Sequence, residues 1–166
     1  YFHAADDVCT FDVKGIRFAL NICEDTWYAE MPRKAREHGA QVLLVPNASP
    51  YHMHKQHLRV ETMRENVSRQ GLAMVYANLI GAQDELVFDG SSFVLDSSGT
   101  VCAQMKPFAE DFMLVQFDDG QPLSQSLPEP QSLEAQVYSA LVLGVRDYVG
   151  KNGFPGVIIG LSGGID

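Results

Sequence analysis

The sequence has few basic residues and no long apolar run. Lys and Arg number 12 against 21 Asp and Glu among 166 residues, which gives a formal net charge of −9. Because such a chain offers no basic field to hold phosphate groups, we expect neither a nucleic acid nor an anionic membrane as its partner. Its apolar stretches are shorter than a bilayer-spanning helix needs, and its opening residues show no signal-peptide pattern.

Cysteine is scarce as well. Cys9, Cys23 and Cys102 are scattered through the chain, without the spacing of a zinc site. We therefore expect reduced thiols and a cytoplasmic location. The apolar fraction of 46% and the charged fraction of 20% are typical of a globular protein, and 166 residues suffice for one ordinary core and part of a second.

One of these cysteines stands where a buried strand ends. Residues 16–22 are mostly apolar, polar and acidic residues begin directly after Cys23, and a helical pattern follows from about Tyr28. A cysteine on a sharp strand-to-helix turn is placed as a nucleophile, since the unpaired N–H groups beside it can receive an oxyanion. Glu24 and Asp25 disfavour a thiolate, so a base or cation from elsewhere would have to activate it. Taken alone, the stretch favours the plainer interpretation, in which Cys23 is a small core residue.

A strand–helix–strand unit surrounds this turn. Residues 28–38 have a helical pattern, and residues 41–45 form an apolar strand that Pro46 ends. The unit predicts parallel neighbouring strands joined by a right-handed crossover. The loop at residues 46–50 then lies at the same edge of the sheet as Cys23, and this is the edge where α/β proteins bind ligands.

The longest helical pattern covers residues 52–70, and its apolar stripe consists of Leu58, Met63 and Val67. Three histidines stand near its start, at His52, His54 and His57. A metal site is one interpretation of them, but no carboxylate or cysteine stands at a matching helical offset. His52 could instead be the general base of a Cys–His pair with Cys23. A solvent-facing or helix-capping histidine is the interpretation that the sequence favours.

The rest of the chain predicts a mixed sheet and then a second unit. Strand and hairpin patterns occur at residues 72–80, 92–95, 101–105 and 111–117. Residues 118–130 contain three prolines and few apolar anchors, so we interpret them as a linker. A helix at residues 133–149 follows, and then a parallel-type strand at residues 157–159 and a glycine loop. Both ends look cut, as in an interior piece of a longer protein.

Several motifs together resemble known families. Residues 22–27, Ile-Cys-Glu-Asp-Thr-Trp, are similar to the nucleophile turn of the nitrilase, or carbon–nitrogen hydrolase, family. Residues 22–25, 46–52 and 81–90 resemble the glutaminase part of the glutamine-dependent NAD synthetases, and residues 161–166 resemble the pyrophosphate loop of their synthetase domain. The resemblance covers essentially the whole chain.

The resemblance implies an α/β fold in two parts. Residues 1–120 would be the carboxyl-terminal part of a nitrilase-like layered α-β-β-α sandwich, a glutaminase domain truncated at its amino end. Residues 121–130 would be a linker. Residues 131–166 would be the first helix and strand of a doubly wound parallel-sheet synthetase domain that binds ATP, truncated at its carboxyl end.

The resemblance also implies a reaction and its partners. The glutaminase domain would release ammonia from glutamine, and the synthetase domain would use ATP and Mg²⁺ to convert deamido-NAD to NAD with that ammonia. A homo-oligomer is implied as well, because nitrilase-like domains usually self-associate.

Individual residues acquire roles in the same way. Cys23 would attack the glutamine amide and the N–H of Glu24 would help form the oxyanion hole, while Ser49 and Lys55 would bind glutamine. Without the resemblance, a turn-forming Ser49 and a solvated Lys55 are equally good interpretations. The ATP pyrophosphate would be bound by the glycine loop, which consists of Gly160, Leu161, Ser162, Gly163, Gly164, Ile165 and Asp166. Asp166 would also hold Mg²⁺ beside the phosphates.

The sequence also departs from the family pattern. The glutamate base, the lysine and a glutamine-binding tyrosine of this family belong to motifs upstream of Tyr1, so we expect the isolated chain to be inactive. Two other interpretations stay open. One is a stand-alone amidase of the nitrilase family, with the residues after Pro130 as a tail, and the other is a non-catalytic oligomerisation module.

Overall fold

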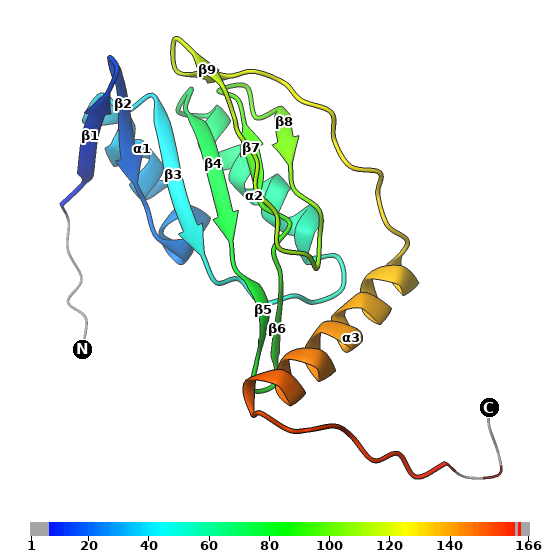
Figure 1. Ribbon diagram of the computed structural model, residues 1–166. Coiled ribbons are helices and arrows are strands. Elements are labelled where there is room, and N and C mark those ends of the chain that lie inside the picture. Colours follow the sequence, from blue (N-terminus) through cyan, green and yellow to red (C-terminus); the bar gives the residue numbers. More distant parts are fainter. Residues whose placement is uncertain (1–6, 162, 164–166) are drawn as a thin grey trace.

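The computed structural model describes residues 7–161 and 163, and its centre is a six-stranded mixed sheet (Figure 1). In sheet order the strands are β1 (Cys9–Val13), β2 (Ile16–Leu20), β3 (Val42–Asn47), β4 (Ala73–Asn78), β7 (Phe93–Leu95) and β8 (Val101–Gln104). β2, β3 and β4 are parallel, whereas the remaining neighbours are antiparallel. The mixed sheet that the sequence predicts is confirmed.

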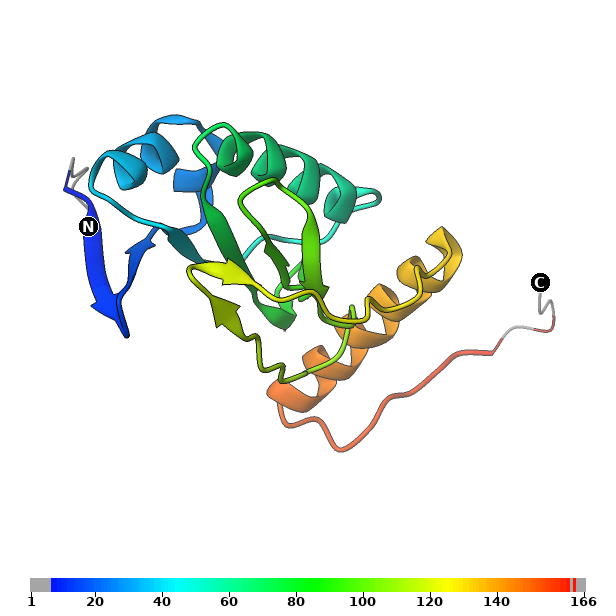
Figure 2. The ribbon, with the colours of Figure 1, turned by 90° about the horizontal axis from the view of Figure 1, so that it is seen from above.

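Two helical crossovers make the parallel part. α1 (Glu30–Glu37) lies between β2 and β3 in the chain, and α2 (Lys55–Ser68) lies between β3 and β4. Figure 2 shows both helices on one face of the sheet. Because the three strands run the same way, the segments that follow β2 and β3 meet at one edge, as the sequence predicts.

The main core lies between this face of the sheet and the two helices. Alternate residues of each strand point toward the helices, as the period of a strand requires. The buried cluster that results consists of Ala19, Ala35, Ala40, Leu43, Val45, Met63, Val67, Leu72, Met74, Tyr76, Phe93 and Leu95. The rings of Tyr76 and Phe93 stack within it, with their centroids 4.7 Å apart.

The buried face of α2 differs from the predicted stripe. Met63 and Val67 are buried as predicted, but Leu58 is 45% exposed and Arg59 is fully buried. Arg59 precedes Met63 by four residues, about one helical turn, so the two side chains share a face. Leu58 precedes Met63 by five residues and is turned away by about 140°. A charged residue therefore occupies the core side of α2.

A second hairpin projects from the main sheet and packs against the last helix (Figure 1). The hairpin is formed by β5 (Ile80–Gln83) and β6 (Leu86–Asp89), and the helix is α3 (Leu133–Lys151). The predicted helix at residues 133–149 is thus confirmed. None of the helices in the described part of the chain is both long and apolar enough to span a bilayer.

Polar contacts fix α3 to this hairpin. The Asp147 carboxylate accepts a hydrogen bond from the N–H of Ala82 at 2.8 Å. Lys151 Nζ donates to the Ala82 carbonyl at 2.5 Å and lies 3.2 Å from the Asp147 carboxylate. One backbone position of β5 is therefore bonded to α3 on both its N–H and its C=O.

The first crossover differs in detail from the prediction. A 3-10 helix, η1 (Cys23–Trp27), follows Cys23 directly, and α1 begins at Glu30 rather than Tyr28. The strand predicted to end at Pro46 continues to Asn47. Pro46 is tolerated because β2 pairs with β3 only as far as Leu44, so its missing N–H interrupts no ladder on that side.

Residues 111–116 form no strand, which corrects the prediction for residues 111–117. Only β9 (Phe117–Asp118) pairs, and its partner is β10 (Gln121–Pro122). The side chains of this segment do alternate in exposure: Met113 and Val115 are half-buried, whereas Phe112 and Leu114 are exposed. The segment thus has one covered side but no neighbouring strand to complete a ladder.

The strand predicted at residues 157–159 is also absent from the structure. Val157, Ile158 and Ile159 are exposed and have no strand pairing. A parallel strand is normally covered by neighbours on both sides and both faces, and no described residues cover these three. The boundaries predicted for the linker and the second domain stay a prediction.

Candidate active site

Cys23 begins a strained turn at the end of β2. Its backbone φ is +48°, a left-handed conformation that residues other than glycine rarely adopt. Such strain persists where the surrounding structure holds it, and it is found at active sites, including the strand-to-helix turns that present a nucleophile. The residue is half-buried, in contrast to the buried Cys102. Cys23 is therefore outside the buried core and begins a strained turn, the kind of position at which a nucleophile can be presented.

Hydrogen bonds hold this turn in place. The Asp25 carboxylate accepts the N–H of Ile22 at 2.8 Å, and Thr26 Oγ1 donates to the Cys23 carbonyl at 3.0 Å. From α2, Asn66 Nδ2 donates to the Thr26 carbonyl at 2.7 Å. One acidic neighbour of Cys23 is thus a structural cap, and the turn is tied to α2.

Glu24 follows Cys23 at the exposed start of η1. Among residues 7–161 and 163, the N–H of Glu24 has no hydrogen-bond acceptor, as is usual in the first turn of a helix. Its side chain points elsewhere, since Glu24 Oε1 accepts a hydrogen bond from the Tyr28 hydroxyl at 3.4 Å. The backbone donor beside the thiol is therefore available to an incoming oxygen.

Lys55 contacts the other end of η1. Its Nζ lies 4.4 Å from the centroid of the Trp27 ring, which is a cation–π contact. The described residues provide no carboxylate partner for this ammonium group. The contact brings the first residue of α2 to the turn that begins at Cys23, so these two predicted site residues belong to one region.

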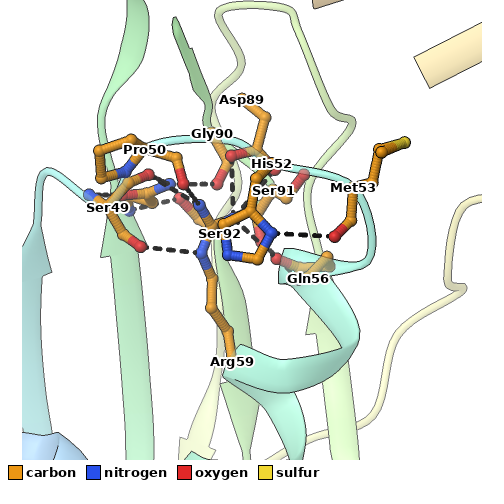
Figure 3. Close-up of polar contacts among 11 residues, drawn as sticks. Ser49, Pro50, His52, Met53, Gln56, Arg59, Asp89, Gly90, Ser91 and Ser92 are labelled. Carbon is orange, nitrogen blue, oxygen red and sulfur yellow. Dashed lines mark hydrogen bonds and ion pairs between the residues drawn. The ribbon is translucent and has the colours of Figure 1, made fainter. Parts of the chain in front are cut away.

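Ser49 lies on the loop after β3 and is almost fully buried. Its N–H donates to Asn78 Oδ1 at 2.9 Å, and its Oγ accepts a hydrogen bond from Arg59 Nε at 3.1 Å. Arg59 in turn lies 2.9 Å from Asp89 at the end of β6. Figure 3 shows Ser49, Arg59 and Asp89 directed toward one another. Two strands and a helix thus fix the position of Ser49.

Tyr76 is a buried tyrosine of β4 whose hydroxyl is influenced by both Cys23 and Ser49. Its hydroxyl is buried and has no hydrogen-bond partner among the described residues. Burial is the main reason that its pKa rises to about 12, Arg59 and Ser49 oppose the rise, and Cys23 and Asp89 add to it. The Tyr76 hydroxyl is therefore a neutral group within electrostatic range of both loops.

No hydrogen bond joins His52 to Cys23 in the described structure. Its ring is exposed, and its Nδ1 lies 2.9 Å from the Met53 carbonyl oxygen (Figure 3). The described residues also include no group of three or more His, Cys, Asp and Glu side chains that could hold a metal ion. Neither the Cys–His pair nor the histidine metal site gains support.

The predicted glycine loop is described only in part. Gly160, Leu161 and Gly163 are exposed, and the rest of the loop, Ser162, Gly164, Ile165 and Asp166, lies outside the described residues. The structure therefore brings Cys23, Glu24, Ser49 and Lys55 to one edge of the sheet but does not test the predicted ATP and Mg²⁺ site.

Sequence reasoning missed Arg59, Asn66 and Asp89. A signal for Arg59 exists, because it shares the helical spacing of Met63 and Val67 and so belongs to the buried face. No comparable signal marks Asn66 or Asp89, whose partners lie 40 and 30 residues away in the sequence.

Known proteins resemble this chain in sequence and in fold. The glutamine-dependent NAD(+) synthetase of Xanthomonas campestris is 42% identical over 164 residues, covering 96% of this chain and 30% of the relative. That of Acinetobacter baylyi is 38% identical over 168 residues, covering 100% of this chain and 31% of the relative. The chain thus spans about 30% of the length of the curated relatives that it matches.

Solved structures agree. The glutamine-dependent NAD+ synthetase of Acinetobacter baumannii in complex with ADP superposes with a TM-score of 0.90 at 34% identity, covering 95% of this chain and 30% of that one. An amidase of the nitrilase superfamily from Nesterenkonia superposes with a TM-score of 0.57 at 25% identity, covering 64% of this chain and 41% of that one. Residues 1–122 match the model of the carbon–nitrogen hydrolase family. The chain, in which Cys23 begins a strained turn, therefore belongs to the carbon–nitrogen hydrolase family.

Proposed function

We propose that this chain is part of an ATP-dependent, glutamine-hydrolysing NAD synthetase that converts deamido-NAD to NAD. The observation that carries the proposal is the extent of the similarity, since the named glutamine-dependent NAD(+) synthetases of Xanthomonas campestris and Acinetobacter baylyi align with 96% and 100% of the chain. This alignment includes both the Cys23 turn and the residues after the linker, whereas the amidase similarity covers 64% of the chain.

In this proposal Cys23 is the nucleophile that hydrolyses glutamine. Its thiolate forms a bond to the side-chain amide carbon, and the amide nitrogen leaves as ammonia after gaining a proton. Water then hydrolyses the thioester to glutamate and frees the thiol. The N–H of Glu24 stabilises the oxyanion of each tetrahedral intermediate, and its lack of another acceptor supports this role.

Ser49 and Lys55 bind glutamine in the same proposal. Lys55 supplies a cation for the α-carboxylate, and its packing against Trp27 without a carboxylate partner among the described residues supports this role. Ser49 supplies a compact hydrogen-bonding group, and its fixed position on the loop after β3 supports that role.

The proposal also divides the chain into two domains. Residues 1–120 belong to a glutaminase domain whose complete form is an α-β-β-α sandwich, residues 121–130 are the linker, and residues 131–166 begin the synthetase domain. ATP is a substrate of that domain. Gly160 to Asp166 would contact its pyrophosphate, and Asp166 would hold Mg²⁺, which neutralises phosphate charge when bound. A cytoplasmic location and a homo-oligomer are further parts of the proposal.

The test uses the full-length protein that carries this chain. We expect it to form NAD from deamido-NAD and ATP with either glutamine or ammonia as the nitrogen source. Replacing Cys23 by Ala should abolish synthesis from glutamine and leave synthesis from ammonia. Synthesis from glutamine that survives this substitution would refute the role of Cys23.

A stand-alone amidase is the second candidate, favoured by the structural similarity to the Nesterenkonia amidase. Glutamine or amide hydrolysis without any ATP-dependent NAD formation would support it. A non-catalytic oligomerisation module would instead leave Cys23 unmodified by a glutamine-derived electrophile. The isolated chain should release no ammonia from glutamine, and turnover that Cys23→Ala abolishes would contradict this expectation.

A further inference from the structure

Arg59 is a fully buried cation that the proposed reaction does not use. A guanidinium group without solvent is costly unless its donors are satisfied, and the side chain is 0% exposed. Its Nη1 lies 2.9 Å from Asp89 and 3.2 Å from Gln56 Oε1. Its Nη2 donates to the carbonyls of Ser49 and Pro50 at 2.7 and 3.1 Å. Together with the hydrogen bond from Nε to Ser49 Oγ, these contacts hold the guanidinium group against the loop after β3.

These contacts leave only the hydroxyl of Ser49 partly engaged. Its N–H is bonded to Asn78, its carbonyl accepts from Arg59 and Asn78, and its Oγ accepts from Arg59 Nε. The hydroxyl hydrogen makes no hydrogen bond in the described structure, although the partnerless Tyr76 hydroxyl lies close enough for Ser49 to oppose the rise of the Tyr76 pKa. Because the oxygen already accepts a hydrogen bond from a cation, the hydroxyl is polarised and its hydrogen is directed away from the guanidinium.

We propose that Arg59 is a positioning residue that fixes the Ser49 hydroxyl as a hydrogen-bond donor to an oxygen of the substrate. The inference rests on the proposed function, in which Ser49 binds glutamine. It assigns a direction to the bond, since Ser49 then donates its hydroxyl hydrogen to a carboxylate or carbonyl oxygen of the substrate. Ser49 and Lys55 would both be donors, which suits a substrate with a free carboxylate.

The planar fork of arginine explains why this position is not a lysine. One guanidinium reaches Ser49, Pro50 and Asp89 at the same time, and these residues belong to the loop after β3 and to the end of β6. A lysine ammonium could keep the charge pair with Asp89 but could not hold both oxygens of Ser49 in the same geometry. The substitution Arg59→Lys therefore separates positioning from charge.

The test measures glutamine hydrolysis by the full-length protein with Arg59→Lys, Ser49→Ala and the double variant. Arg59→Lys should raise KM for glutamine about tenfold, the effect of one lost hydrogen bond, and change kcat less. The double variant should show nearly the same KM as Ser49→Ala, because Arg59 acts only through Ser49. Arg64→Lys, a matched substitution on α2 whose Nε bonds the Gly99 carbonyl, should leave KM unchanged.

Several outcomes would overturn the inference. An unchanged KM in Arg59→Lys, when Ser49→Ala raises it, would show that Arg59 does not position Ser49. Multiplying effects in the double variant would show that the two residues act independently. If Arg59→Lys does not fold, Asp89→Asn serves as the second perturbation of Arg59, and it must give the same KM increase and the same non-additivity with Ser49→Ala. A wild-type protein that hydrolyses no glutamine would instead refute the proposed function.

Discussion

The buried pair of Arg59 and Asp89 makes a quantitative prediction about stability. Their side chains are 0% and 3% exposed, and Arg59 Nη1 lies 2.9 Å from the carboxylate. Replacing Asp89 by Ala leaves a buried cation without its counter-charge, which typically costs about 3 to 5 kcal/mol of unfolding free energy. Arg59 keeps neutral acceptors at Ser49, Pro50 and Gln56, so we expect a loss near the lower end, about 3 kcal/mol.

The assay is urea unfolding of the chain followed by the fluorescence of Trp27, its only tryptophan. Trp27 is half-buried against the core and Lys55, so its emission should change on unfolding. A chain of this size has a denaturant slope on the order of 2 kcal/mol/M in urea, so a loss of about 3 kcal/mol lowers the midpoint by about 1.5 M.

Two controls decide whether burial is the cause. Asp12→Ala breaks the surface ion pair between Asp12 and Arg17, in which the two side chains are 56% and 46% exposed, respectively. This substitution should shift the midpoint far less, because solvent screens the pair. The double variant Arg59→Met with Asp89→Leu removes both charges and keeps similar volumes, so it should regain most of the stability that Asp89→Ala loses. Equal shifts for Asp89→Ala and Asp12→Ala would refute the reasoning.

Three further predictions concern other contacts. Replacing Trp27 by Leu removes the aromatic face under Lys55 and should raise KM for glutamine in the full-length protein between about two- and fivefold, with an unchanged KM as the contrary result. Burial disfavours the ionised form of Asp96, but hydrogen bonds from its own turn outweigh burial and lower its pKa. The ionised carboxylate therefore stabilises the folded protein above about pH 4, and this stabilisation is lost as the pH falls through the lowered pKa. The stability difference between wild type and Asp96→Asn, measured by urea unfolding at pH 7 and pH 3, should therefore shrink at the lower pH. Replacing Asp147 by Ala removes the acceptor of the Ala82 N–H, and hydrogen exchange of that amide should become about tenfold faster. An unchanged exchange rate would show that α3 does not protect this amide.

The sequence predicted those elements whose signal is local. The crossover helices and the long helix at residues 133–149 follow from helical periodicity, and the structure contains them. The prediction of a strand at residues 111–117 was wrong because alternation of apolar and polar residues indicates only that one side of a segment is covered. Whether a neighbouring strand offers hydrogen bonds depends on residues far along the chain, which no local pattern contains.

The candidate site was predictable to a similar depth. The turn at Cys23 and the loop carrying Ser49 were expected at one edge because parallel strands require it, and the structure has this arrangement. The buried position of Arg59 was missed because an arginine is usually a surface residue, and the apolar Leu58 was assigned to the buried face of the helix instead. Helical spacing from Met63 was the better guide, since it holds whatever the chemistry of the side chain.

The contacts of α2 explain what fixes the Cys23 turn and the Ser49 loop relative to each other. Near its first residue Lys55 contacts Trp27, and near its end Asn66 bonds the Thr26 carbonyl, so α2 holds the Cys23 turn at two points. Between them Arg59 holds Ser49 on the loop after β3. Because one rigid helix makes all three contacts, the thiol and the Ser49 hydroxyl are placed relative to each other by side chains of α2 as well as by strand pairing. A substitution that shifts α2 should therefore disturb both residues together, whereas a substitution in either loop should disturb only one.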